Sequence, residues 1–67
     1  MKYTAAAMIH STNQQDTVTV LYKATDKNDY IVITPQGTAC HAIYNPFTGL
    51  YYADDIYGIV KGGDQQC

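Results

Sequence analysis

The strongest constraint in this sequence is a turn, Pro35-Gln36-Gly37, between two short runs that contain β-branched and aromatic residues. Proline presets the backbone angle of the first turn position, and glycine takes the left-handed conformation that closes a three-residue hairpin loop. The flanking runs, 30–34 and 38–44, are therefore predicted to be paired antiparallel strands. The middle of the chain is thus expected to be β-structure.

Runs of similar composition recur along the chain, separated by segments rich in turn residues. Their near-alternation of apolar and polar residues has the period of two that a half-buried strand requires. The segments between them contain Asn, Pro, Asp or Gly, which favour hairpin loops. The further strands are predicted at 17–24, 50–53 and 56–60, and the further loops at 26–29 and 45–49.

The two ends of the chain need separate treatment. Residues 2–10 mix helix-favouring alanine and methionine with strand formers, and we predict a strand because no helix N-cap precedes them. Residues 62–67 are predicted to be a flexible polar tail, so that residues 1–61 form a single small β domain. The apolar run at 5–9 is too short for a signal peptide core or a membrane span. We therefore expect a cytoplasmic protein with both cysteines reduced.

Pairing the strands outward from each turn assigns their side chains to two faces, because neighbours on a strand point to opposite sides. The expected pairs are Ala24 with Ile31, Ile33 with Ala39, Ile31 with His41, and Ile43 with Tyr51. The expected core face is Val18, Val20, Tyr22, Ala24, Ile31, Ile33, Ala39, His41, Ile43, Tyr51 and Ala53. The predicted fold is an all-β antiparallel meander of five to six strands, either open or closed into a small SH3-like or OB-like barrel.

The face opposite this core has an apolar, tyrosine-rich centre rather than the polar surface of a solvated sheet. Either barrel closure or a partner must cover it. Tyrosine is enriched at protein interfaces, although it is also an ordinary strand former. Phe47 at a loop tip either inserts into a partner or folds back over the sheet, and Asp54 and Asp55 form an acidic corner or a charged strand edge. The predicted partner-binding residues are Tyr30, Val32, Tyr44, Phe47, Leu50, Tyr52, Asp54 and Asp55.

The charged residues argue against several functional classes. The chain has four lysines, six aspartates, no arginine and no glutamate, with a net charge of -2. This inventory disfavours nucleic acid and phosphate ligands, which basic clusters recognise. Cys40 and His41 are neighbours on a predicted strand, so their side chains diverge and form neither a catalytic pair nor half of a zinc site. We expect no catalytic residues, no metal and no cofactor.

These observations predict a non-enzymatic protein-binding module. A domain of 67 residues has a small core and commonly gains further burial by association. An inhibitor or adaptor that occludes a partner protein has this character, as do small proteins that phages and other mobile elements encode against host defences. Two alternatives remain: a self-associating structural protein whose tyrosine face is buried in a homodimer, and a single-strand nucleic-acid binder whose tyrosines stack on bases.

Overall fold

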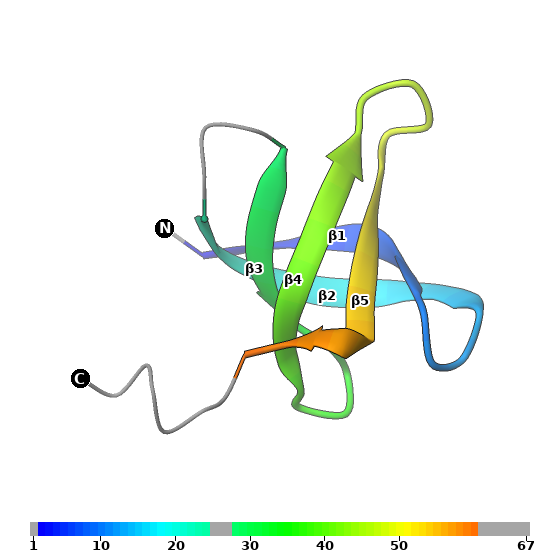
Figure 1. Cartoon of the computed structure of the whole chain (residues 1–67). Helices are drawn as coiled ribbons and strands as arrows, with labels where there is room; N and C mark the ends of the chain where they lie inside the picture. The colour runs from blue at the N-terminus through cyan, green and yellow to red at the C-terminus, as the bar shows by residue number, and fades with distance from the viewer. Residues whose placement is uncertain (1, 25–27, 61–67) are drawn as a thin grey trace.

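The computed structural model describes residues 2–24 and 28–60, which form a closed five-stranded barrel (Figure 1). Its strands are β1 (Tyr3–Ile9), β2 (Gln14–Lys23), β3 (Asp29–Ile33), β4 (Ala39–Asn45) and β5 (Leu50–Ile59). Consecutive strands pair in antiparallel fashion, whereas β1 and β5 pair in parallel. A meander with an odd number of strands must close in this way, because its first and last strands run in the same direction. The predicted all-β fold is confirmed, and its closure is consistent with a small SH3-like or OB-like barrel.

The core lies inside this barrel. In Figure 1, β1 and β2 run across the direction of β3, β4 and the first part of β5, so inward side chains from all five strands meet in the middle. Many of these side chains are small, since a narrow barrel leaves room for few large ones. The core cluster is Ala7, Ile9, Val18, Val20, Val32, Cys40, Ala42, Tyr51 and Ala53.

The alanine-rich N-terminal segment is a strand, as predicted. Ala7 and Ile9 are buried in the core, and Ala5 packs against it. Alanine at these inward positions suits the narrow interior of the barrel. Tertiary packing therefore decides a segment whose local composition is ambiguous between helix and strand.

The turns have the expected chemistry. Gly37 has a φ of 91°, and its N–H donates to the Thr34 carbonyl over 2.8 Å. Gly49 has a φ of 74° and closes the β4–β5 loop by donating to the Asn45 carbonyl over 2.8 Å. Asn13, with a φ of 56°, has the same role between β1 and β2, where its N–H donates to the Ile9 carbonyl over 2.7 Å. The predicted loop 26–29 and the predicted tail 62–67 lie wholly or partly outside the described residues.

One error in the predicted register arises between β2 and β3. The pairs Ile33 with Ala39 and Ile31 with His41 are confirmed on the β3–β4 side. On the β2 side, Ile31 pairs with Tyr22 rather than Ala24, and the ladder shifts between Val20 and Tyr22. This bulge reverses the phase of β3 relative to β2, because a slip of one residue moves every side chain to the other face.

A second error lies between β4 and β5. Ile43 pairs with Tyr52, not with Tyr51, and Tyr44 takes the place opposite Tyr51. The two shifts together reverse the phase of β3 and β4 relative to the prediction. Val18 and Val20 of β2 and Tyr51 and Ala53 of β5 are in the core as predicted. Ile31 is nevertheless buried, as predicted. The expected core residues that are not buried are Tyr22, Ala24, Ile33, Ala39, His41 and Ile43.

The predicted strands 50–53 and 56–60 belong to one strand, β5. His41 pairs with Asp54, but the preceding residue Cys40 pairs with Ile59, so residues 55–58 form an insertion on the β5 side of the ladder. Figure 1 shows β5 bending sharply in this region. Insertions of this kind bend a strand and redirect its side chains.

Candidate functional site

Two of the tyrosines predicted on the binding face, Tyr30 and Tyr44, lie instead with Tyr3 and Tyr51 at one end of the barrel. We call Tyr3, Tyr30, Tyr44 and Tyr51 the tyrosine end. The Tyr3 and Tyr51 hydroxyls lie 2.7 Å apart in a hydrogen bond, and the Tyr51 ring packs against Tyr30 and Tyr44 at centroid distances of 5.2 and 4.9 Å. Burial, followed by the hydrogen bond with Tyr3, raises the pKa of Tyr51 far above its ordinary value. These contacts pack the tyrosines together at one end of the barrel and give them a structural role.

Three of the predicted binding residues therefore change their assignment. Val32 is fully buried in the core, which corrects its placement on an open face. Tyr30 and Tyr44 are half-buried and pack against that core. The cause in each case is the reversed phase of β3 and β4 described above.

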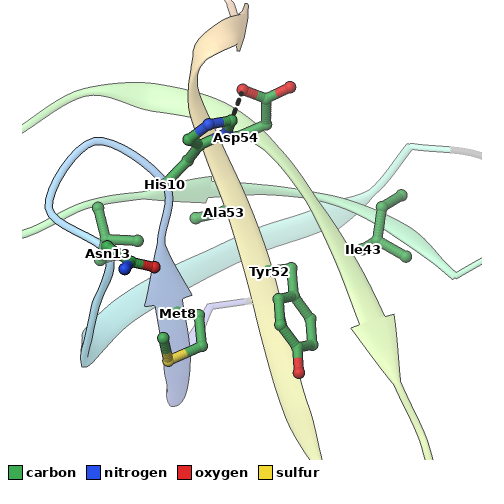
Figure 2. A pocket seen from close by; sticks show the side chains of 8 residues that line it. Met8, His10, Asn13, Ile43, Tyr52, Ala53 and Asp54 are labelled. Atoms are coloured by element: carbon green, nitrogen blue, oxygen red, sulfur yellow. Dashed lines mark ion pairs between the residues drawn. The ribbon is translucent and has the colours of Figure 1, made fainter.

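An exposed apolar row crosses the outside of the barrel on three neighbouring strands. Tyr52 of β5 pairs with Met8 of β1 on one side and with Ile43 of β4 on the other. The exposed fractions of Ile43 and Tyr52 are 53% and 41%. Figure 2 shows Tyr52 between Met8 and Ile43. We call these three residues the apolar row.

The apolar row forms part of an open groove with a volume of about 390 Å³. Its floor and apolar side come from β1, β4 and β5, and its polar end comes from residues near the β1–β2 turn and the start of the β5 bend (Figure 2). Clefts of this size, mostly apolar with a few polar groups, are typical of ligand sites. The lining residues are Met8, Ile9, His10, Asn13, Ile43, Tyr52, Ala53 and Asp54.

Asp54 supplies the charge at the polar end. The backbone N–H groups of Tyr57 and Ile56 donate to its Oδ1 over 2.9 and 3.3 Å, and these bonds lower the pKa of the carboxyl below its ordinary value. His10 Nδ1 lies 3.6 Å from the same oxygen. The carboxylate is therefore held in position by the bend of β5 and is ionised at neutral pH.

Asp55, its neighbour, has a different environment. Its carboxylate accepts hydrogen bonds from the backbone N–H of Ser11 over 2.8 Å and from the Ser11 hydroxyl over 2.5 Å. These bonds join the β1–β2 turn to the bend in β5. The two aspartates lie at the same end of the barrel, as predicted, but only Asp54 lines the groove.

Phe47 is at the tip of the β4–β5 loop, with an exposed fraction of 96%. Its N–H donates to the Asn45 side-chain oxygen over 2.8 Å, a local turn that holds the loop in its extended position. The alternative in which Phe47 folds back over the sheet is therefore wrong. Leu50, partly exposed, pairs with Asn45 on the outer side of the same hairpin as Ile43 and Tyr52.

Cys40 and His41 diverge as expected. Cys40 is buried, and burial, followed by the nearby carboxylates of Asp55 and Asp54, raises the pKa of its thiol to about 11. His41 is on the outside, where its Nδ1 lies 3.2 Å from an Asp29 oxygen. Among residues 2–24 and 28–60, no group of three or more His, Cys, Asp or Glu side chains is arranged to hold a metal ion. The described part of the chain also contains no helix that is long and apolar enough to cross a membrane.

Of the residues that line this groove, sequence reasoning predicted Tyr52 and Asp54 as binding residues and missed the others, including Met8 and Ile43 of the apolar row. Ile43 was assigned to the core by the shifted register, and the N-terminal strand was left unpaired with any neighbour. The alternation of Ala7 and Ile9 around Met8 is the signal that places Met8 on the outer face of β1.

Comparison of the chain with protein-family profiles, with curated proteins and with solved structures finds no match. The functional argument therefore rests on the surface of the barrel.

Proposed function

We propose that this protein is a non-enzymatic protein-binding module that contacts its partner through the groove and the adjoining loop tip. The observation that carries the proposal is the apolar row, in which exposed Tyr52 and Ile43 and half-buried Met8 lie across three strands of a barrel with few core residues. Exposed apolar surface that continues into a cleft is typical of interaction sites. Phe47 beyond the end of the hairpin extends the contact that a partner can make.

An inhibitor or adaptor that occludes a partner is the form of this function that the residues favour. The groove offers contact area and one fixed carboxylate, and no nucleophile and base lie together there. Binding is the chemistry that such a surface supports. We place this interaction in the cytoplasm, and a role against host defences of the kind encoded by mobile elements is one setting for it.

Homodimerisation is the alternative, because the same apolar row can be buried against a second copy. We do not extend the proposal to single-stranded nucleic acid. At the tyrosine end the Tyr51 ring packs edge-on against Tyr30 and at a tilt against Tyr44, and the charged residue lining the groove is a carboxylate, which repels phosphate.

The test begins with the mass in solution, measured by light scattering across a concentration series. We expect a monomer. Immobilised wild-type protein should then retain a partner protein. The Ile43→Ser variant should lose this partner, whereas the Tyr22→Ser variant should retain it. Tyr22 is a matched control because it is similarly exposed, at 48%, but belongs to β2 and does not line the groove.

Two results would contradict the proposal. If Ile43→Ser and wild type capture the same partner equally well, the groove is not the contact surface. If the wild type is a dimer and Ile43→Ser is a monomer, the alternative of self-association is correct.

A further inference from the structure

The charges around the groove are one-sided. Among the residues that line the groove, Asp54 carries a formal charge at neutral pH. A second carboxylate belongs to Asp29 of β3, which pairs with Ile43 on the opposite side of β4 from Tyr52. Carboxylates therefore flank the apolar row at the bend of β5 and at the start of β3. The imidazole Nδ1 atoms of His10 and His41 lie 3.6 and 3.2 Å from oxygens of Asp54 and Asp29.

The lysines that the structure describes are distant from this polar end of the groove. Lys2 precedes β1, and Lys23 ends β2, where its ammonium lies 5.9 Å from the centroid of the Tyr30 ring. Both positions belong to the tyrosine end of the barrel. Asp54, by contrast, is in the middle of β5, beyond Tyr51 and away from the tyrosine end. The described cations and the groove carboxylate are thus separated along the barrel.

The closed sheet also restricts how a partner can bind here. At the level of Tyr52, β5 is paired with β1 on one side and with β4 on the other. A partner strand cannot add to the sheet at this point, because the main-chain groups are already paired. Recognition at the groove must therefore be made through side chains.

We propose that the groove binds a segment of the partner protein in which a bulky apolar side chain is flanked by lysine or arginine. The apolar side chain enters the groove beside Tyr52 and Ile43, and a flanking cation pairs with Asp54. This inference rests on the proposed function and specifies the chemistry of its partner. The groove volume of about 390 Å³ suits one such side chain rather than an extended helix face.

The test uses three short peptides as probes: acetyl-GSKFKSG-amide, acetyl-GSEFESG-amide and acetyl-GSKSKSG-amide. Each is titrated into the ¹⁵N-labelled protein while backbone amide shifts are followed. We expect the first peptide to shift the amides of Met8, Ile43 and Tyr52 in a saturable way. The acidic peptide and the peptide without phenylalanine should bind more weakly at the same residues.

The variant Asp54→Asn isolates the charge. Its side-chain oxygen can still accept the N–H groups of Tyr57 and Ile56, so the bend of β5 is retained while the negative charge is lost. Affinity for the basic peptide should fall about 2- to 5-fold and lose most of its salt dependence, as expected for one exposed ion pair. Affinity for the acidic peptide should not fall.

The outcomes separate this inference from the proposed function. Equal or tighter binding of the acidic peptide overturns the basic-partner inference and leaves an apolar docking groove in place. A lack of any shift at the three groove residues also overturns it, while the capture experiment with Ile43→Ser still decides the proposed function. Shifts of the same residues on dilution of the free protein identify a second copy as the occupant and overturn it as well.

Discussion

Tyr51 and Tyr52 are adjacent residues of the same type on β5, yet they belong to two different regions of the molecule. Tyr51 has an exposed fraction of 7% and joins the tyrosine end through its ring and its hydroxyl. Tyr52 is exposed at 41% and lies in the apolar row. Aromatic content therefore does not distinguish an interface from a core in this chain. The phase of the strand distinguishes the two tyrosines, because neighbouring side chains on a strand point to opposite faces.

The largest expected effect contrasts the core with the apolar row. Val32→Ser leaves a hydroxyl and a cavity in the core and should cost about 2–4 kcal/mol, enough to unfold much of a domain of this size. Ile43→Ser, on the exposed row, should cost under about 1 kcal/mol. Thermal unfolding followed by circular dichroism measures both. If Ile43→Ser unfolds the protein while Val32→Ser keeps its Tm, the two regions are reversed.

A change at Gly58 should damage the polar end of the groove and spare the tyrosine end. A Cβ at this position would lie 3.0 Å from the Asp54 carbonyl oxygen, so the backbone of the β5 bend must shift. We expect Gly58→Ala to cost about 1–3 kcal/mol, in the range of overpacked sites. Amide shifts should change around Asp54 and remain unchanged around Tyr3 and Tyr30. Gly37→Ala, in the β3–β4 turn, is strained by the positive φ of 91° at that position and should change amide shifts around that turn, not around Asp54.

The two adjacent tyrosines provide a matched pair with a smaller effect. Tyr51→Phe removes the hydroxyl that hydrogen-bonds to the Tyr3 hydroxyl. The Tyr3 hydroxyl then lacks this partner, which should lower the free energy of unfolding by about 1 kcal/mol. Tyr52→Phe should be neutral in stability, because its ring is on the exposed row. Urea unfolding, which resolves differences of this size, tests the pair. Equal losses for both variants would contradict the separate roles of the two tyrosines.

The smallest expected effect on stability near neutral pH comes from the titration of the Cys40 thiol, which is buried in the core. The pKa of Cys40 is raised from 9.0 to about 11 in the folded protein. The folded state therefore holds its proton more tightly, and the stabilising contribution is complete below pH 9 and is lost as the pH rises from 9 to 11. Unfolding free energies of wild type and Cys40→Ala should diverge least at pH 11.

Labelling with a thiol reagent provides an independent measurement for Cys40. In a Cys67→Ser background it is the remaining cysteine of the chain. A buried thiol with a raised pKa reacts only through opening of the fold, so labelling at pH 8 should be slow and should accelerate in urea. Fast labelling of the native protein would show that the core around Cys40 is open.

Much of the fold could be predicted because its signals are local. The turn at Pro35-Gln36-Gly37 and the closing role of Gly49 depend on backbone conformations that few residues adopt, and both occur in the structure. The alternation of Val18 and Val20 correctly placed them in the core. Of the predicted binding residues, Phe47 and Tyr52 are exposed and Asp54 lines the groove.

The parts of the fold and of the groove that the sequence did not predict depend on how the strands pair with one another. The bulge between Val20 and Tyr22 has no mark in composition, and one extra residue there turned β3 and β4 over. Val32 was consequently expected outside and Ile43 inside. The groove itself could not be anticipated either, because it needs Met8 to lie beside Tyr52, a parallel contact between strands at opposite ends of the chain.

The sequence by itself determined the number of hairpins near its centre, the all-β class and the net negative charge, because turn residues, strand propensity and charge are properties of short segments. Only the tertiary structure decided which side of each strand faces inward and which tyrosines are exposed. The physical reason is the period of two along a strand: a one-residue shift in pairing leaves the local sequence unchanged and exchanges the core with the surface.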